Sequence, residues 1–128
     1  MQEDRILKQR VVGTYYIGFN QMQVVLREGT GGEFWHCPED GSVPRMKIGA
    51  DQKQWEEVLS CLLHEATEFL YDTMRVRFGR SNDLSKDHSE YVFMFTHNEL
   101  SHSCACLGEF IAACLPDLSV AWKKWNKK

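Results

Sequence analysis

A histidine and two glutamates lie within residues 62–68, where the sequence Leu-Leu-His-Glu-Ala-Thr-Glu nearly reproduces the helix of a zinc protease. Such a helix carries two histidines four residues apart that hold the metal, and a glutamate after the first that acts as general base. His64 and Glu65 fit this pattern, but Glu68 stands where the second histidine belongs. A carboxylate is also an accepted zinc ligand. The segment is therefore either a metal site or a protease-like helix with another function, and we favour the second interpretation.

The metal interpretation needs a third ligand from elsewhere in the chain. His64 and Glu68 are one helical turn apart, so their side chains share a face. His97, in a predicted turn, would be the third zinc ligand, and Glu65 would activate a water in the open position. However, His64 lies nearly opposite the apolar stripe of its helix, and a second carboxylate lowers affinity for a borderline-soft metal. We therefore expect no catalytic residue and less than one equivalent of zinc, with a zinc enzyme based on Glu65 as the alternative.

Histidine and cysteine also alternate at His102, Cys104 and Cys106. Residues two apart on a helix point in different directions, so these side chains are not expected to converge on one ion. Cys61, Cys104 and Cys114 are expected to be small core residues instead. The five cysteines form an odd set, which indicates reduced thiols in a cytosolic protein and not a disulfide framework.

Two segments offer contacts to phosphate. The loop 29–32, Gly-Thr-Gly-Gly, lacks the Lys-Ser/Thr and the following helix of a phosphate-binding loop, so we expect a plain turn. Arg75, Arg77 and Arg80 surround Phe78 in a polar segment. Arginine binds phosphate through paired donors, and an aromatic ring stacks on a base. This segment is therefore a candidate for a nucleotide contact, beside the simpler interpretation of a solvated loop.

Length and composition describe a single domain over residues 1–128. Hydrophobic residues make up 43% of the chain, as expected for a protein with one core. No apolar run approaches the roughly 18–20 residues of a membrane span, and the charged start of the chain does not resemble a signal peptide. A net charge of -3 argues against a nucleic-acid polymer as ligand. We therefore expect a cytoplasmic protein without membrane association.

Hydrophobic patterning predicts an α+β fold. Four segments rich in β-branched and aromatic residues indicate an antiparallel meander of strands over 11–17, 22–27, 33–37 and 43–48. Apolar residues at spacings of three and four then predict a helix that Asp51 caps and that runs to about Met74. Residues 75–87 are polar and are expected to form a loop.

The remaining residues are expected to complete the sheet and its helical layer. Residues 90–95 are apolar on both faces, which predicts a central strand. Thr96 and Glu99 form a capping box that starts a long helix. Pro116 is expected to interrupt this helix and to leave a short final helix over 117–125. The two main helices would then pack on one face of the sheet.

Residues 45–118 resemble a group of small bacteriophage and prophage proteins. The shared core is a strand, a helix with Leu-Leu-His-Glu and a glutamate four residues after the histidine, a strand leading to a His-bearing turn, and a closing amphipathic helix. In this chain these parts are residues 46–48, 62–68, 95–97 and 100–115. Within the group, the chain is similar to the first family of Thoeris anti-defence proteins. These are phage sponges that sequester cyclic ADP-ribose-type and related cyclic nucleotide signals.

The resemblance implies that a small anionic nucleotide is bound in the host cytoplasm and is not cleaved. Arg75 and Arg77 are expected to bind phosphate, and Phe95 is expected to stack on a base. Polar edges of the ligand would be bound by Thr96, Asn98 and Asp117. The family pattern has an Arg-Asp pair near the end of the closing helix, where this chain has Pro116-Asp117. No cofactor is expected, with zinc as the alternative.

A chain of this size has little room for a deep pocket, so we expect binding at the interface of a homo-oligomer. Trp122, Trp125 and the cysteine-bearing helix would supply the apolar surface for assembly. Two other functions stay open. One is a zinc-dependent metallopeptidase-like protein with ligands His64, Glu68 and His97. The other is an inhibitor that binds a host nuclease complex through the two tryptophans.

Overall fold

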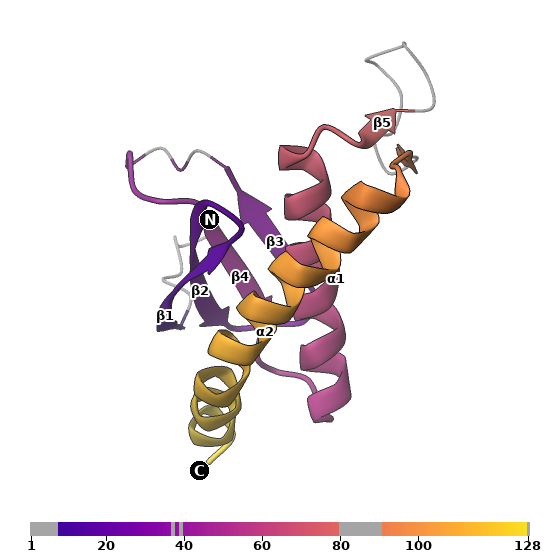
Figure 1. The fold of residues 1–128 in the computed structure, drawn as a ribbon. Coiled ribbons are helices and arrows are strands. Elements are labelled where there is room, and N and C mark those ends of the chain that lie inside the picture. Colours follow the sequence, from indigo (N-terminus) through magenta and orange to yellow (C-terminus); the bar gives the residue numbers. More distant parts are fainter. Residues whose placement is uncertain (1–7, 37, 39, 80–90, 128) are drawn as a thin grey trace.

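The computed structural model describes residues 8–36, 38, 40–79 and 91–127, and it has the predicted α+β fold (Figure 1). A four-stranded sheet is covered by two long helices, and a short two-stranded ribbon lies apart from the sheet. The elements, in chain order, are β1 (Gln9–Ile17), β2 (Asn20–Arg27), β3 (Gly32–Trp35), β4 (Arg45–Gly49), α1 (Trp55–Thr73), β5 (Arg77–Gly79), β6 (Tyr91–Phe93) and α2 (His97–Trp125).

Strands β1 and β2 form the predicted hairpin. Ile17 pairs with Asn20, so Gly18 and Phe19 alone make the turn. Gly18 has a φ of 62°, a conformation that suits a two-residue hairpin turn and that glycine adopts without strain. The hairpin therefore follows directly from the local sequence.

The sheet is mixed, because β4 lies between β2 and β3. The strand order is β1-β2-β4-β3, with β4 parallel to β2 and antiparallel to β3. A simple meander would place β3 beside β2, so the order of these strands differs from the sequence-based expectation. The loop before β3 displaces that strand by one position and leaves the central place to β4.

Asp51 holds this arrangement together and does not cap α1, which corrects the predicted start of the helix. Its carboxylate accepts a hydrogen bond from Gly29 N–H at 2.7 Å, and its own N–H donates to the Gly29 carbonyl. A Cβ on Gly49 would lie 2.4 Å from Thr30 Cα, so only glycine allows β4 to pass this close to the loop. The loop that precedes β3 is thus a turn fastened to the end of β4.

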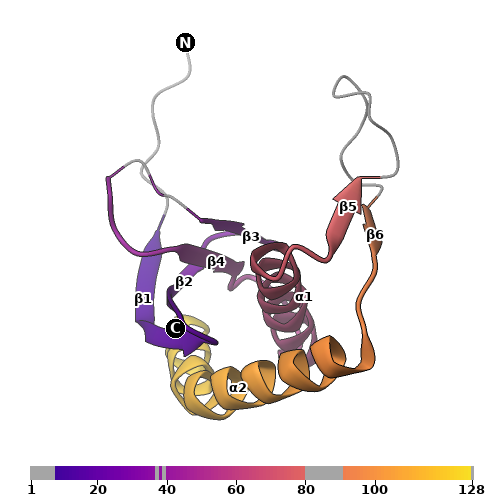
Figure 2. The same ribbon diagram turned by 45° about the horizontal axis from the view of Figure 1, so that its top comes forward.

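The core lies between the sheet and both helices (Figure 2). Alternate residues of the central strands point to the same face, because side chains alternate along a strand. Those of β2 and β4 meet buried positions spaced three or four apart on each helix. The buried residues that form this contact include Met22, Val24, Leu26, Met46, Ile48, Val58, Leu62, Ala66, Phe69, Cys106, Phe110, Cys114 and Leu118. Both helices therefore pack on one face of the sheet, as predicted.

The segment predicted as a central strand, residues 90–95, is not part of the main sheet. Its described part forms β6, which pairs only with β5. Residues 77–79, predicted as loop, are β5. An apolar strand can bury its side chains against helix ends as well as inside a sheet. Here the rings of Phe93 and Phe95 contact Tyr71 of α1. The ribbon stands at the end of α1 and the beginning of α2 (Figure 2).

Helix α2 begins at the predicted capping box and continues through Pro116. The Thr96 hydroxyl accepts from Glu99 N–H, and the Glu99 carboxylate accepts from Thr96 N–H. The helix is continuous to Trp125, so the predicted break is wrong. Its axis changes direction between the orange and yellow parts in Figures 1 and 2, as expected where proline removes a backbone donor.

Helix α2 is also long and apolar enough to cross a membrane, judged by length and composition alone. The expectation that no segment approaches this length was therefore too strong. In this fold the helix contributes Phe110, Cys114 and Leu118 to the core.

Trp122 and Trp125 do not form an exposed surface. They donate hydrogen bonds to the Ala50 carbonyl and the Asp51 carboxylate, respectively.

Candidate functional site

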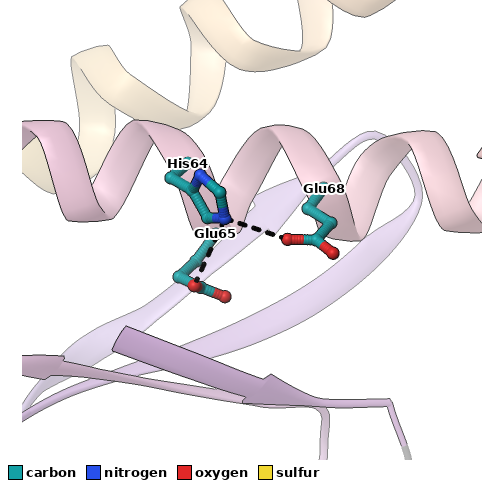
Figure 3. Close-up of side chains that lie close together, drawn as sticks. All are labelled: His64, Glu65 and Glu68. Atoms are coloured by element: carbon teal, nitrogen blue, oxygen red, sulfur yellow. Dashed lines mark ion pairs between the residues drawn. The ribbon is translucent and has the colours of Figure 1, made fainter. Parts of the chain in front are cut away.

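His64, Glu65 and Glu68 converge on one point beside α1 (Figure 3). His64 Nε2 lies 3.1 Å from Glu68 Oε2 and 4.0 Å from Glu65 Oε1. The three donor atoms lie within 4.8 Å of one another. We call these three residues the HExxE cluster. Its geometry allows all three side chains to face a single ion.

The two glutamates of the HExxE cluster lie in different surroundings. The Glu65 side chain is 10% exposed, whereas that of His64 is 69% exposed. A Cβ on Gly32 would lie 3.0 Å from Glu65 Cγ, so the absent side chain of Gly32 leaves the space that Glu65 fills. Burial raises the pKa of Glu65, with a smaller opposing effect of His64. No described residue donates a hydrogen bond to this carboxylate.

A row of charge contacts extends from Glu68 to the edge of the sheet. Arg77 of β5 donates to Glu68 Oε1 at 2.9 Å and lies 3.2 Å from Asp72 Oδ1. The other oxygen of Asp72 lies 2.5 Å from His36 Nε2. That last pair is a close charge contact without the angles of a hydrogen bond. Arg77 is therefore engaged by two carboxylates, and its guanidinium also stacks on Tyr91.

His97 does not join the HExxE cluster. It is the exposed first residue of α2. The alternative zinc site predicted from His64, Glu68 and His97 is thus not assembled in a single chain. Glu65, predicted as its general base, has its Oε1 atom 4.0 Å from His64 Nε2.

An open groove of about 390 Å³ runs along the outer face of α1 beside the HExxE cluster. We call it the α1 groove, and its walls are largely apolar. The residues that line it are Ser60, Leu63, His64, Thr67, Glu68, Tyr71 and Phe93. His64 and Glu68 thus face a space that a small ligand can enter.

A second hollow, of about 540 Å³, lies where β6 leads into α2. It is lined by Phe93, Met94, Phe95, Thr96 and Glu99, and we call it the α2 hollow. The ring of Phe95 is 40% exposed and lies 5.2 Å from Tyr71. Of the residues predicted to bind ligand, Phe95 and Thr96 line the hollow, whereas Asn98 is exposed beside it on α2 and is not part of its lining. Phe93 also lines the α1 groove, so the two spaces adjoin.

Arg75 lies next to the α2 hollow. Its neighbour Val76 accepts a hydrogen bond from Met94 N–H at 2.9 Å. Arg75 is exposed and forms no ion pair with any described residue, so of the two predicted phosphate-binding arginines it is the accessible one. Arg80 lies outside the described residues.

Asp117 lies far from the other predicted ligand-binding residues. It follows Asn98 along α2 by roughly 28 Å, at about 1.5 Å per residue. Its carboxylate accepts a hydrogen bond from the Tyr15 hydroxyl at 2.7 Å. Burial, and then this bond, raises the pKa of Tyr15. Asp117 thus fastens α2 to β1, and it could meet a ligand in the α2 hollow only if a second chain brought it there.

The cysteines only partly match their predicted places. Cys114 is buried as expected, and burial raises its pKa to about 12. Cys104 is exposed instead, and Cys106 takes the buried position. Cys106 Sγ lies 3.5 Å from His102 Nε2, an i,i+4 contact that the sequence reasoning missed. Burial raises the pKa of Cys106, so the thiol is not activated as a nucleophile. Cys37 lies outside the described residues.

The engagement of Arg77 is the main feature of the site that sequence reasoning missed. The i,i+4 spacing of Glu68 and Asp72 was a usable signal for a shared cationic partner. Nothing local in the sequence indicates that His36 would reach the carboxylate of Asp72.

The chain matches no protein-family model, no curated protein and no solved structure, so its function is inferred from these residues and their geometry.

Proposed function

We propose that this protein is a phage-type anti-defence protein that binds and sequesters a cyclic nucleotide immune signal in the host cytoplasm. The ligand is of the cyclic ADP-ribose type or a cyclic oligonucleotide, and it is held without cleavage. The protein acts by lowering the free concentration of the signal. It needs no catalytic residue for this role.

The observation that carries the proposal is the α2 hollow. Its aromatic wall of Phe93 and Phe95 is accessible, and such rings stack on bases of any sequence. The ring of Phe95 is supported from behind by Tyr71, so the surface is held in place before a ligand arrives. A rigid stacking surface reduces the entropy lost on binding.

The charge around the α2 hollow suits a phosphate. The N-terminus of a long helix carries partial positive charge, and its first N–H groups have no partner inside the helix. The N–H groups of His97 and Asn98 donate to no described residue. Glu99 also faces the hollow, but its carboxylate accepts from Thr96 N–H. Arg75 adds an exposed cation, one residue from the backbone partner of Met94.

The HExxE cluster gives a reason to favour binding over hydrolysis. A zinc peptidase needs a third ligand beside His64 and Glu68 and a separate carboxylate as base. His97 lies outside the cluster, so the described residues do not assemble the predicted zinc-protease ligand set. This geometry fits the non-cleaving behaviour that the resemblance to the Thoeris anti-defence family implies.

Thermal unfolding with a panel of cyclic nucleotides tests the proposal. A ligand that binds only the folded state adds about 2.7 kcal/mol of stability at a hundredfold excess over Kd. For a domain of this size the melting temperature should rise by several degrees. We expect this rise with at least one cyclic ADP-ribose isomer or cyclic di- or trinucleotide, and recovery of intact ligand after heating.

A matched pair of variants locates the binding site. Phe95→Ala should weaken binding about tenfold or more, because loss of one stacking ring costs about 1–3 kcal/mol. Phe19→Ala removes an equally accessible ring, 96% exposed in the β1–β2 turn, and should leave binding unchanged. No shift with any member of the panel would refute the proposal. Recovery of cleaved ligand would replace sequestration with hydrolysis.

A further inference from the structure

The HExxE cluster has the spacing of a metal-binding site. Two ligands at about 2.1 Å from one ion stand at most about 4.2 Å apart, and about 3.0–3.4 Å apart in octahedral or tetrahedral geometry. His64 Nε2 lies 3.1 Å from Glu68 Oε2, within this range, and 4.0 Å from Glu65 Oε1. The three donor atoms lie within 4.8 Å of one another, so the Glu65 carboxylate must move closer to bind the same ion as His64 and Glu68. The pairs are marked in Figure 3.

Glu65 supplies an independent indication of a ligand. Its side chain is nine-tenths buried, and no described residue donates a hydrogen bond to it. A buried carboxylate without a donor is costly, so such groups are usually paired or bound to a metal. One oxygen of the carboxylate lies 4.0 Å from His64 Nε2, on the side of the ring away from α1 (Figure 3). A cation bound between these groups would satisfy the carboxylate.

Glu68 is held in the orientation that a ligand needs. Arg77 binds Glu68 Oε1 at 2.9 Å, which leaves Oε2 directed at His64. Metal-binding carboxylates are commonly fixed by a hydrogen bond to their second oxygen in this way. The two carboxyl groups of Glu65 and Glu68 outnumber the guanidinium of Arg77, which also contacts Asp72. This excess of acidic groups favours a divalent cation.

We propose that His64, Glu65 and Glu68 form a binding site for one divalent first-row transition ion, with the remaining coordination positions open to the α1 groove. One imidazole and two carboxylates suit Mn²⁺ and Zn²⁺. Glu65 is a ligand of this ion and not a general base. The site differs from the zinc-protease arrangement in both its third ligand and the absence of a free base in the cluster. The inference does not rest on the proposed function.

The proposal also explains why purified protein should carry less than one equivalent of metal. The open coordination positions and the exposed His64 make the ion exchangeable. Metal ligands must be deprotonated, so binding should weaken as the pH falls. The ion is therefore expected to be lost during purification and to return on addition.

Titration of the full-length, chelator-treated protein with MnCl₂ tests the site, because Mn²⁺ binds oxygen ligands and does not favour the free thiols. We expect one saturable site by electron paramagnetic resonance. His64→Ala, Glu65→Gln and Glu68→Gln should each weaken binding at least tenfold. His97→Ala and His102→Ala, which remove other exposed histidines, should leave the affinity unchanged. ZnCl₂ should compete for the same site.

A measurement on the unaltered chain guards against variants that fail to fold. Bound Mn²⁺ broadens the NMR signals of nearby protons, so the His64 ring signals should disappear at low Mn²⁺ while those of His97 and His102 persist. Absence of saturable binding at millimolar Mn²⁺ would overturn the proposal. Equal broadening of all histidines, or full affinity in folded Glu65→Gln protein, would overturn it as well.

Discussion

Arg75 adopts a left-handed backbone conformation, with a φ of 61°, which costs a residue with a side chain about 1–2 kcal/mol. It follows Met74, the C-cap of α1. Its N–H donates to Asp72 and that of Val76 donates to Tyr71, which is the hydrogen-bond pattern of a Schellman motif. Glycine is the usual residue at this position. A strained arginine beside the α2 hollow therefore suggests that its side chain is needed.

Arg75→Gly should stabilise the protein by about 0.5–1 kcal/mol, because glycine adopts this conformation without strain. It should also reduce the thermal shift produced by the nucleotide, because the accessible cation is lost. Arg75→Ala provides the matched control, since it removes the same charge but keeps the strain. Denaturant titration and the ligand panel would measure both effects. Loss of stability in Arg75→Gly, or an undiminished ligand shift, would contradict this role.

Arg77 should behave differently from Arg75. It is 18% exposed and lies between the carboxylates of Glu68 and Asp72. Arg77→Glu would place three carboxylates together, so we expect a loss of about 1–3 kcal/mol in unfolding free energy. Measurement by urea unfolding would show this loss without any ligand present. If the variant were as stable as the parent, these contacts would not be holding β5 to α1.

Asp51 gives the fold an acid-sensitive contact. Hydrogen bonds from Gly29 N–H and the Trp125 ring hold its pKa below the ordinary value. A lowered pKa contributes stability above the ordinary aspartate pKa of about 3.9, and this stability is lost as the pH falls through the folded-state pKa. Asp51→Asn should therefore cost about 1 kcal/mol at neutral pH. The difference from the parent protein should shrink below about pH 4, and a constant difference across pH would contradict the assignment.

Residue-level predictions from the sequence succeeded where the determinants are local. The capping box at Thr96 needs only residues three apart, and the structure has it. The polar exposure of His64 follows from its position on the helical wheel. Asp51 was assigned to a cap because it precedes a helix. Its actual partners are Gly29 and Trp125, and contacts at such sequence separation leave no local pattern.

At the level of elements, the sequence predicts where strands and helices occur better than it predicts which elements lie side by side. Both hairpin strands and both long helices are present. The position of β4 between β2 and β3 depends on the path of the loop before β3. The alternation of hydrophobic residues does not predict that path. Residues 91–93 are strand but pair with β5, because an apolar segment is equally consistent with a sheet centre and with packing on helix ends. The α2 hollow exists only because of that second arrangement.

Pro116 shows the same limit for helices. Proline in a helix interior either ends or kinks it, and sequence alone does not decide between these outcomes. Here tertiary contacts continue the helix on both sides. Phe110 and Leu118 are fully buried in the same core, and Asp117 bonds to Tyr15 between them. The bend directs the last turns toward the end of β4, where Trp122 reaches the Ala50 carbonyl.

For the molecule as a whole, α2 exposes more apolar surface than a solitary small domain needs. Its most apolar window has a mean hydropathy of 1.5, and 28% of that window is buried. Exposed apolar residues continue along it and the strand before it, at Met94, Phe95, Leu100 and Val120. Most of this apolar window is exposed, and a large exposed apolar surface marks an interaction site. The distance between Asn98 and Asp117 along α2 also means that only two chains could bring both to one ligand.

We therefore expect a symmetric homo-oligomer in aqueous buffer without detergent, assembled through the outer face of α2. Light scattering should give the mass of at least two chains across a wide concentration range. Leu100→Glu, near the start of α2, should shift the protein toward the monomer, because a charge would be buried in the contact. Trp35→Glu, on β3 at the opposite edge of the sheet from β1, should not. A monomer at every concentration would remove this assembly, and recovery in the membrane fraction would assign the apolar face of α2 to lipid instead.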